Sequence, residues 1–328
     1  MIGVGLIGAG FFGQMHARAL AELPDARLVA ASRRSSAALD EFSTRFAVRG
    51  YRDYVDLINA PDVDAVVIAA PHHLHAEMAV QAARAGKHIL LEKPMALSLD
   101  ECDRILSAVT EAGVKIMVGH LNHFARAYQI AKRLLDSGEM GEVVLGTSTM
   151  SKFWFEPNRR QWHLDRAGGG MWLAAGMHCL DRLTWLVGSP AVSVCGQFGT
   201  RFHDQEADDV GMVLVRYENG AVGSIVSTGY RIGAPKHLTE ITCTKGMLNI
   251  EYTAGVTVGR DEKWQSIPES GASDWMPEAL LNEWEAFLTA LELDEEPAVS
   301  GSYARHIMAA VFAAERSSLL RKEVAVEG

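Results

Sequence analysis

The residues best suited to chemistry in this chain are a glycine-rich turn and a lysine, each placed directly after an apolar segment. The turn is Gly8-Ala9-Gly10-Phe11-Phe12-Gly13, and the lysine lies in Glu92-Lys93-Pro94. In a dinucleotide site, Gly8 would form the tight turn, Gly10 would approach the pyrophosphate, and Gly13 would pack against the strand. An ammonium beside a nicotinamide is suited to acid or base chemistry during hydride transfer. Together the two motifs predict an oxidoreductase.

Both motifs lie in a region where short apolar segments alternate with helical patterns. The strands expected there are 3–7, 27–31, 65–69, 88–91 and 115–119, and the helices between them are 12–23, 35–46, 75–85 and 99–112. This alternation predicts an α/β fold with a doubly wound parallel sheet, a Rossmann domain over residues 1–120. It places the glycines and Lys93 at the carboxyl ends of strands, where ligands bind in such sheets.

The remainder of the chain, residues 121–328, has a different pattern. A helix is expected at 128–137, strands at 142–150, 191–198, 210–217, 221–228, 237–244 and 247–252, and closing helices at 277–293 and 302–320. Glu218-Asn219-Gly220 is a typical hairpin turn between two of these strands. We expect a substrate-binding α+β domain with a large, mostly antiparallel sheet, and the last helices can pack back on the first domain.

Composition excludes several classes of protein. A length of 328 residues favours two domains, and a net charge of −10 argues against binding to nucleic acid or an anionic membrane. No segment approaches the ~20 apolar residues of a membrane span. The four cysteines are scattered, which favours reduced thiols and a cytoplasmic protein. Histidine pairs such as His72 with His75 and His120 with His123 lack further ligands of the right type, so we expect no metal.

Cofactor preference is expected to depend on the segment Ala31-Ser32-Arg33-Arg34-Ser35. It lies about 20 residues beyond the glycines, where NAD sites carry an acidic residue for the ribose hydroxyl. Two guanidinium groups and two hydroxyls instead suit a ribose 2′-phosphate. We therefore predict NADP bound by Ser32, Arg33 and Arg34, with NAD as the alternative cofactor. The competing interpretation is the solvated start of a helix.

A second dense cluster lies in the other half of the chain. It contains Trp162-His163-Leu164-Asp165, the triplet Gly168-Gly169-Gly170, and Gly176-Met177-His178-Cys179-Leu180-Asp181. A helix over the last segment places His178 and Asp181 one turn apart on one face. A histidine can exchange a substrate proton near neutral pH, although a buried structural histidine is an equal alternative from these residues alone.

With these motifs in place, the chain resembles the Gfo/Idh/MocA oxidoreductase family over nearly its whole length. The matching elements are the glycine motif, Pro71 to His75, Glu92-Lys93-Pro94, the glycine triplet and the Gly176 to Asp181 segment. The resemblance implies a Rossmann domain followed by an α/β domain built on an open antiparallel sheet. It also implies chemistry on sugars, polyols and related cyclic alcohols or ketones, and dimers or tetramers formed through the exposed face of that sheet.

The resemblance further implies roles for individual residues. Lys93 matches a lysine that lies near the nicotinamide and contacts the reacting oxygen, and His178 matches a histidine that serves as acid or base. Asp181 would orient His178 or make a local contact. The residues implied to bind cofactor are Gly8, Gly10, Phe11, Phe12, Gly13, Pro71, His72, His75, Glu92 and Lys93.

One departure from the family pattern concerns the proton chemistry. Many members carry an aspartate four residues before the histidine, and this chain has Ala174 there. Three interpretations stay open. His178 and Lys93 exchange the proton alone, another group substitutes for the aspartate, or the protein binds cofactor without turnover. The candidate substitutes are His163, Asp165 and Tyr128.

Substrate contacts are expected from aromatic and charged residues near the second cluster. Trp162 and Trp172 can stack on a ring or pack in the core. Arginine is common in the family near His123, so a substrate anion would instead be held by the arginines around Trp162, of which Arg160 is one. The candidate substrate residues are Trp162, His163, Asp165, Trp172, His123 and Arg160.

These observations predict an NADP-preferring enzyme that moves a hydride between nicotinamide and a hydroxyl or carbonyl carbon. The expected substrate is a sugar, a sugar derivative or a cyclic polyol, and the expected catalytic residues are Lys93 and His178. The alternatives are a non-sugar ring substrate, such as a dihydrodiol or hydroxy acid, and a non-catalytic NADP-binding sensor. The expected partners are a small-molecule substrate and further copies of the chain, as a homodimer or homotetramer.

Overall fold

The computed structural model describes residues 1–154, 164 and 169–328. The chain forms two compact units. The first combines Met1–Leu121 with Met276–Arg305, and the second combines Asn122–Trp275 with His306–Gly328. Most of the late helix α8 (Trp275–Glu292) therefore belongs to the unit that begins the chain. No helix in the described ranges is both long enough and apolar enough to cross a membrane.

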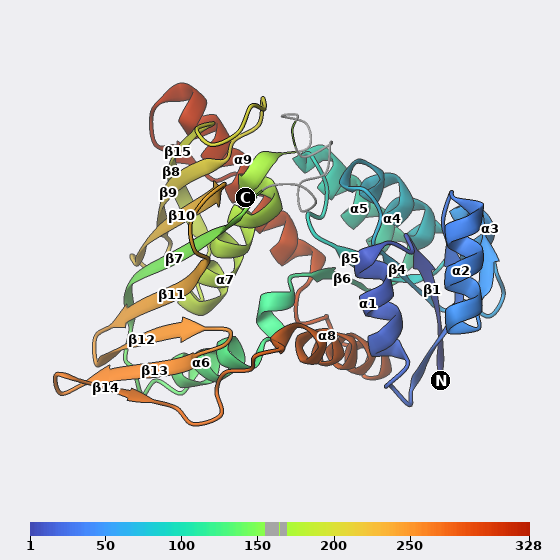
Figure 1. The fold of residues 1–328 in the computed structure, drawn as a ribbon, viewed down its shortest axis with the longest axis horizontal. Coiled ribbons are helices and arrows are strands. Elements are labelled where there is room, and N and C mark those ends of the chain that lie inside the picture. The colour runs from blue at the N-terminus through green and yellow to red at the C-terminus, as the bar shows by residue number, and fades with distance from the viewer. Residues whose placement is uncertain (155–163, 165–168) are drawn as a thin grey trace. The chain divides into compact units, whose positions relative to one another are not determined.

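The first unit is built on a six-stranded parallel sheet in the order β3-β2-β1-β4-β5-β6. Figure 1 labels four of these strands, β1, β4, β5 and β6. Its strands are β1 (Ile2–Ile7), β2 (Ala26–Ser32), β3 (Arg49–Tyr51), β4 (Ala65–Ile68), β5 (His88–Glu92) and β6 (Ile116–Gly119). Its helices, besides α8, are α1 (Phe11–Leu20), α2 (Ser36–Phe46), α3 (Tyr54–Ile58), α4 (His75–Arg84) and α5 (Leu99–Ala112), with a short η1 (His72–Leu74). Strands β4 and β6 are buried along their whole length, as expected for a parallel sheet covered on both faces.

The strand order creates one position where ligands are expected to bind. From β1 the chain runs outward through β2 and β3, and then returns to the other side of β1 to add β4, β5 and β6. The connections after β1 and β4 therefore diverge at their carboxyl ends, which opens a crevice in doubly wound sheets. The glycine motif follows β1, Pro71 follows β4, and Lys93 follows β5 at this same edge.

The second unit carries a nine-stranded sheet in the order β14-β13-β12-β11-β7-β10-β9-β8-β15. Its strands are β7 (Val143–Phe153), β8 (Ala191–Gly199), β9 (Val210–Tyr217), β10 (Val222–Tyr230), β11 (Lys236–Cys243), β12 (Gly246–Glu251), β13 (Gly255–Arg260), β14 (Lys263–Ser266) and β15 (Val324–Ala325). The pairing is antiparallel except between β7 and β10. The other elements are η2 (Leu121–Phe124), α6 (Arg126–Asp136), a π-helical η5 (Trp172–Gly176), α7 (Met177–Val187) and α9 (Gly301–Leu320), which continues from the first unit.

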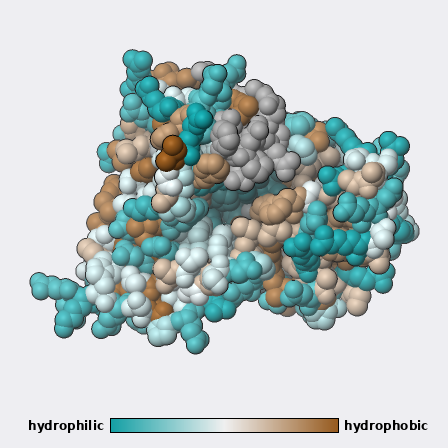
Figure 2. All heavy atoms as spheres, viewed as in Figure 1, coloured by the Kyte–Doolittle hydropathy of each residue, from teal (hydrophilic) through white to brown (hydrophobic). Residues whose placement is uncertain are grey.

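The two faces of this large sheet differ in their surroundings. Helix α7 packs closely on one face, where a Cβ on Gly146 would lie 2.4 Å from Leu183. The opposite face alternates into solvent and leaves Met212 and Leu214 each 55% exposed. In Figure 2, brown apolar atoms lie among teal ones along the margin that this sheet forms at the left.

The predicted fold class is confirmed, with a parallel Rossmann sheet and a second, mostly antiparallel sheet. The sequence patterns missed the short β3 and β15 and the β13–β14 hairpin. Strand β3 has no buried residue, and β14 is exposed along its whole length. Alternation of apolar and polar residues cannot reveal strands that bury so little.

Candidate active site

A cavity of about 970 Å³ opens at the carboxyl edge of the first sheet. Gly8 has a φ of +104°, and a Cβ there would lie 2.4 Å from the carbonyl oxygen of Ala69, so only glycine fits. A Cβ on Gly13 would lie 2.2 Å from the carbonyl oxygen of Gly8. A Cβ on Gly10 would meet nothing within 4 Å, which leaves room for a ligand above the turn. Of the predicted cofactor residues, this cavity brings together Gly8, Gly10, Ser32, Arg33, Arg34 and Pro71.

The start of α1 fits the phosphates of a dinucleotide. Gly10 is the N-cap, no side chain caps the helix, and its first turn contains no acidic residue. The positive end of the helix dipole and the first backbone N–H groups therefore face the turn without a competing carboxylate. Phe11 is 68% exposed beside this turn, whereas Gly13 is buried against the strand.

Three arginines line the part of the cavity near the end of β2. Arg33 donates from Nη1 to the carbonyl oxygen of Ala9 at 2.8 Å, which ties the end of β2 to the glycine turn. Arg34 and Arg52 are exposed on the cavity wall. Asp53 also lines the cavity, and its carboxylate accepts the N–H of Val55 at 3.0 Å as a helix cap. Sequence reasoning missed Arg52 because the short strand before it was not recognised.

Two predicted cofactor residues have structural contacts instead. The His75 ring is completely buried, and its two nitrogens lie 2.8 Å and 2.9 Å from the carbonyl oxygens of Pro94 and Ala70. Burial lowers the pKa of His75, so the ring is neutral and donates to one of these carbonyls at a time. The His72 ring packs 5.5 Å from that of His75, while the neighbouring His73 lines the cavity. The structure thus gives His75 a role in holding the backbone beside Lys93.

Lys93 lies at the end of β5, next to a buried polar cluster. Burial of the Lys93 ammonium lowers its pKa, and the Glu92 carboxylate partly offsets this. Glu92 accepts from His16 Nε2 at 2.9 Å, and Trp284 donates from its indole N–H to His16 Nδ1 at 3.1 Å. Because an indole can only donate, the His16 proton must lie on Nε2 and point at Glu92. The peptide bond between Lys93 and Pro94 is cis.

A second carboxyl group lies close to this cluster. Glu283, one residue before Trp284 on α8, is completely buried, and neither of its oxygens has a hydrogen-bond partner within the described part of the chain. Burial and the charge of Glu92 raise its pKa well above the usual range. Burial therefore favours the neutral form of Glu283, and Glu92 is the carboxylate that partly offsets the burial of Lys93.

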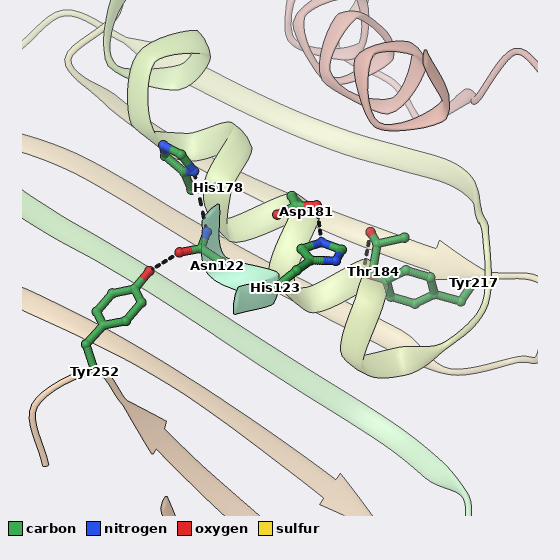
Figure 3. Close-up of polar contacts among 7 residues, drawn as sticks. All are labelled: Asn122, His123, His178, Asp181, Thr184, Tyr217 and Tyr252. Atoms are coloured by element: carbon green, nitrogen blue, oxygen red, sulfur yellow. Dashed lines mark hydrogen bonds and ion pairs between the residues drawn. The ribbon is translucent and has the colours of Figure 1, made fainter. Parts of the chain in front are cut away.

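His178 lies in the first turn of α7 in the second unit, where it contacts Asn122. Asn122 Nδ2 lies 3.4 Å from His178 Nδ1, and Tyr252 donates its hydroxyl proton to Asn122 Oδ1 at 2.5 Å (Figure 3). Behind Tyr252, the fully buried Arg182 donates from Nη1 to the tyrosine oxygen at 3.0 Å. Sequence reasoning missed these three residues. The only signal was the position of Asn122 beside His123 and of Arg182 after Asp181.

Asp181 does not orient His178, which corrects one of the expectations for it. Its Oδ1 lies 2.9 Å from His123 Nε2, and both side chains are buried (Figure 3). The His123 ring also stacks on Trp185 with centroids 4.2 Å apart. His123, predicted to contact substrate, is therefore held inside the unit by Asp181, which lies one turn beyond His178 on α7.

Other predicted residues are either in the core or outside the description. Trp172 is completely buried, donates its indole N–H to the carbonyl oxygen of Val311 at 3.2 Å and packs against Phe198, so it belongs to the core. Tyr128 is paired with Thr239 at 3.0 Å behind Tyr252 and does not replace the missing aspartate. Four candidates lie outside the described residues, namely Arg160, Trp162, His163 and Asp165. Within the described ranges no group of three or more acidic, histidine or cysteine side chains could hold a metal ion.

Comparison with known proteins decides the family. Residues 2–120 match the oxidoreductase family with an NAD-binding Rossmann fold, and residues 128–249 match the GFO/IDH/MocA C-terminal domain. The chain belongs to the Gfo/Idh/MocA oxidoreductase family. The family assignment from sequence motifs is confirmed, and the protein is a nicotinamide-dependent oxidoreductase that acts on CH–OH or C=O groups rather than a non-catalytic sensor.

Individual relatives resemble the chain over most of its length. It is 30% identical to levoglucosan dehydrogenase from Pseudarthrobacter phenanthrenivorans, in an alignment that covers 76% of this chain and 74% of the relative. It is 26% identical to myo-inositol 2-dehydrogenase from Thermotoga maritima, with 99% of this chain and 98% of the relative covered. The crystal structure of an NAD binding oxidoreductase from Klebsiella pneumoniae superposes with a TM-score of 0.91 at 26% identity, covering 100% of this chain and 99% of the other.

Proposed function

We propose that this oxidoreductase prefers NADP and interconverts a hydroxyl and a carbonyl group on a sugar, sugar derivative or cyclic polyol. The relatives named for levoglucosan and myo-inositol support this substrate class. The observation that carries the cofactor preference is the arginine group at the end of β2. Arg34 and Arg52 are exposed on the wall of the dinucleotide cavity, and Ser32 occupies the end of the strand. A 2′-phosphate would find two guanidinium groups there.

The cofactor preference can be tested by reversing charge on the cavity wall. Arg34→Glu and Arg52→Glu should each raise KM for NADP by at least ~10-fold, the scale of one lost charge-assisted contact, and change KM for NAD much less. Arg84→Glu, an exposed arginine on α4, is the matched control. A wild-type KM for NAD well below that for NADP would contradict the preference.

When bound, NADP would supply the hydride acceptor or donor at its nicotinamide ring. Lys93 and His178 are the two side chains that we assign to the reacting oxygen of the substrate. Lys93 emerges at the edge of the sheet that carries the cofactor cavity, and burial lowers the pKa of its ammonium, which favours the neutral amine that can take a proton. His178 would provide a second polar contact to the same oxygen.

Turnover itself requires a substrate screen. Sugars, anhydrosugars, inositols and their ketones should be tested with NADP and NAD at the nicotinamide absorbance. Dihydrodiols and hydroxy acids belong in the same screen because they are the substrates of the competing hypothesis. Turnover of the second group alone would overturn the proposed substrate class while leaving the reaction type intact.

We also propose that the exposed face of the nine-stranded sheet binds a second copy of this chain. Leu145 and Val222, paired across β7 and β10, continue the apolar surface formed by Met212 and Leu214. A single-site change such as Leu214→Lys should convert a dimer or tetramer to a smaller species in light scattering coupled to gel filtration. Ile232→Lys, which charges a loop residue 94% exposed, is the control. A wild-type monomer would contradict the proposal.

A cytoplasmic location is proposed on the state of the cysteines. All four are unbridged, and Cys102, Cys179 and Cys243 are buried. Buried thiols without disulfides fit a reducing compartment. Fractionation of cells that express the native gene would test this, and recovery outside the cytoplasm would contradict it.

A further inference from the structure

The contacts of His178 give its hydrogen-bond chain a fixed direction. The chain starts at Arg182, whose guanidinium carries only donors, so the oxygen of Tyr252 must accept from it. The hydroxyl proton of Tyr252 is then free to be donated to Asn122 Oδ1. With its oxygen engaged, Asn122 presents its NH₂ group to Nδ1 of His178. Nδ1 is therefore the acceptor, and a neutral His178 ring carries its proton on Nε2.

We propose that Asn122 is a positioning residue that holds His178 as the Nε2–H tautomer, so that His178 donates a hydrogen bond to the reacting oxygen and does not take its proton. This inference rests on the proposed function of His178 at that oxygen. It goes further because it distinguishes a histidine that donates a hydrogen bond from one that accepts the proton. It assigns the choice between these two roles to Asn122, Tyr252 and Arg182.

The buried cation at the start of these hydrogen bonds is held by neutral groups. The partners of Arg182 in the described residues are the Tyr252 and Ser148 hydroxyls, the Thr149 carbonyl oxygen and the Cys179 sulfur, with no carboxylate among them.

His237 is a histidine whose pKa is affected by the charge of Arg182. Its ring lies 5.9 Å from that of Tyr252, and burial together with Arg182 and Lys152 lowers its pKa to about 4. The His237 ring is therefore disfavoured as a cation.

The proton balance then assigns the base to Lys93. In alcohol oxidation the C–H bond breaks and its hydride passes to the nicotinamide, while the O–H bond breaks and its proton needs a lone pair. An Nε2–H histidine offers none at Nε2, whereas the neutral amine of Lys93 does. In reduction the Lys93 ammonium returns the proton. His178 keeps its proton throughout and stabilises the negative charge on the oxygen.

Two replacements of His178 separate a donor from a base. Gln places an amide N–H near the position of Nε2, whereas Asn places one near Nδ1, and neither can act as a base. His178→Gln should keep kcat within about 10-fold of wild type with an unchanged pH profile, and His178→Asn should lose at least ~100-fold, the scale of one lost donor. Equal loss of activity in both, with disappearance of the acid limb, would show that His178 is the base and overturn the inference.

The tautomer itself can be read without turnover. Long-range ¹H–¹⁵N spectra of the full chain with NADP, with the His178 signals assigned by their loss in His178→Gln, should show Nε2–H in the wild type. Asn122→Asp replaces the donor with an acceptor and should move the proton to Nδ1. Tyr252→Phe should give a mixture of tautomers because the amide can then rotate.

Tyr217→Phe is the matched control for this spectrum. Tyr217 is another buried tyrosine and contacts Thr184 on α7 at 3.5 Å, away from Asn122 (Figure 3). It should leave the His178 signals unchanged. A wild-type Nδ1–H ring would overturn the inference even if the enzyme is active. Conversely, an Nε2–H ring in a protein whose His178 variants are all fully active would refute only the proposed function.

Discussion

The two units hold their candidate catalytic side chains in opposite electrostatic surroundings. Lys93, a cation in water, is set beside the buried carboxylate of Glu92, which is fixed by His16 and Trp284. His178 is set in front of a buried cation, Arg182, and is separated from it by neutral groups. In both cases the hydrogen bonds lead away from the reactive atom into the core. The difference lies in which charge is buried behind it.

This difference teaches how one family fold can lose an acidic residue without losing an acid–base pair. A carboxylate near His178 would favour the imidazolium, and Ala174 stands where family members often carry one. In the described residues His178 instead contacts the Asn122 amide, whose NH₂ group favours a neutral ring that accepts at Nδ1. A carboxylate of the first unit, Glu92, lies beside Lys93. Proton transfer is thus expected from the lysine, and hydrogen-bond donation from the histidine.

The largest expected effect comes from removing the lysine. Lys93→Met should lower kcat by at least ~100-fold, because the reacting proton loses its acceptor, while NADP still binds to the cavity at the glycine turn. Single-turnover kinetics and fluorescence titration with NADP would measure the two properties separately. Lys87→Met, which removes a lysine that donates to the carbonyl oxygen of Val63 in the same unit, is the control. Near-normal kcat in Lys93→Met would show that Lys93 is not the proton acceptor, and the proposed contrast between the two units would be wrong.

The second test removes the buried cation from the other unit. Arg182→Met leaves Ser148 and Tyr252 without their buried donor and should destabilise the protein by ~3 kcal/mol. The folded protein that remains should keep the wild-type pH profile of kcat, because the proton acceptor is Lys93 and not His178. Urea denaturation and the pH profile of kcat would check the two effects. Unchanged stability would mean that the hydrogen bonds made by Arg182 contribute no net free energy to folding.

The position of Lys93 could be predicted from the sequence more readily than the surroundings of His178. The glycine motif and Lys93 follow strands whose apolar segments are contiguous, so the sheet topology alone brings them to one edge. His178 was found from its motif, but its partners come from a short 3₁₀ segment, a strand end and the far side of its own helix. Asn122 and Tyr252 lie 130 positions apart in the sequence, and no local pattern pairs them. For the same reason Asp181 was assigned to the nearer histidine in the sequence and belongs to His123 in the fold.

The third test concerns the protonated acid beside Glu92. A carboxyl whose pKa is raised in the folded state contributes its stability below the unfolded pKa and loses it as pH rises through the folded value. Glu283→Gln should therefore match wild type near pH 4, below the unfolded pKa of a glutamate, and be more stable at pH 9, by about 2–4 °C in Tm for ~1 kcal/mol. Thermal unfolding at both pH values would measure this. A variant that is less stable than wild type at both values would show that Glu283 is ionised and paired in the native protein.

The smallest expected effect comes from the indole that fixes His16. Trp284→Phe keeps an aromatic ring on α8 but removes the donor to His16 Nδ1, so the His16 proton is no longer confined to the nitrogen that faces Glu92. The hydrogen bond to Glu92 is then made only part of the time, which should cost ~1 kcal/mol of stability and lower kcat about 3-fold. Phe287→Leu, on the same helix and packed against Trp284, removes a similar volume without touching His16. If both variants lower Tm but only Trp284→Phe changes the pH profile of kcat, the buried cluster acts on Lys93 through Glu92 and not merely through packing. Identical pH profiles would show that the cluster of His16, Glu92 and Trp284 has only a structural role. The hydrogen bonds from Arg182 to His178 in the second unit would then be the ones that affect catalysis.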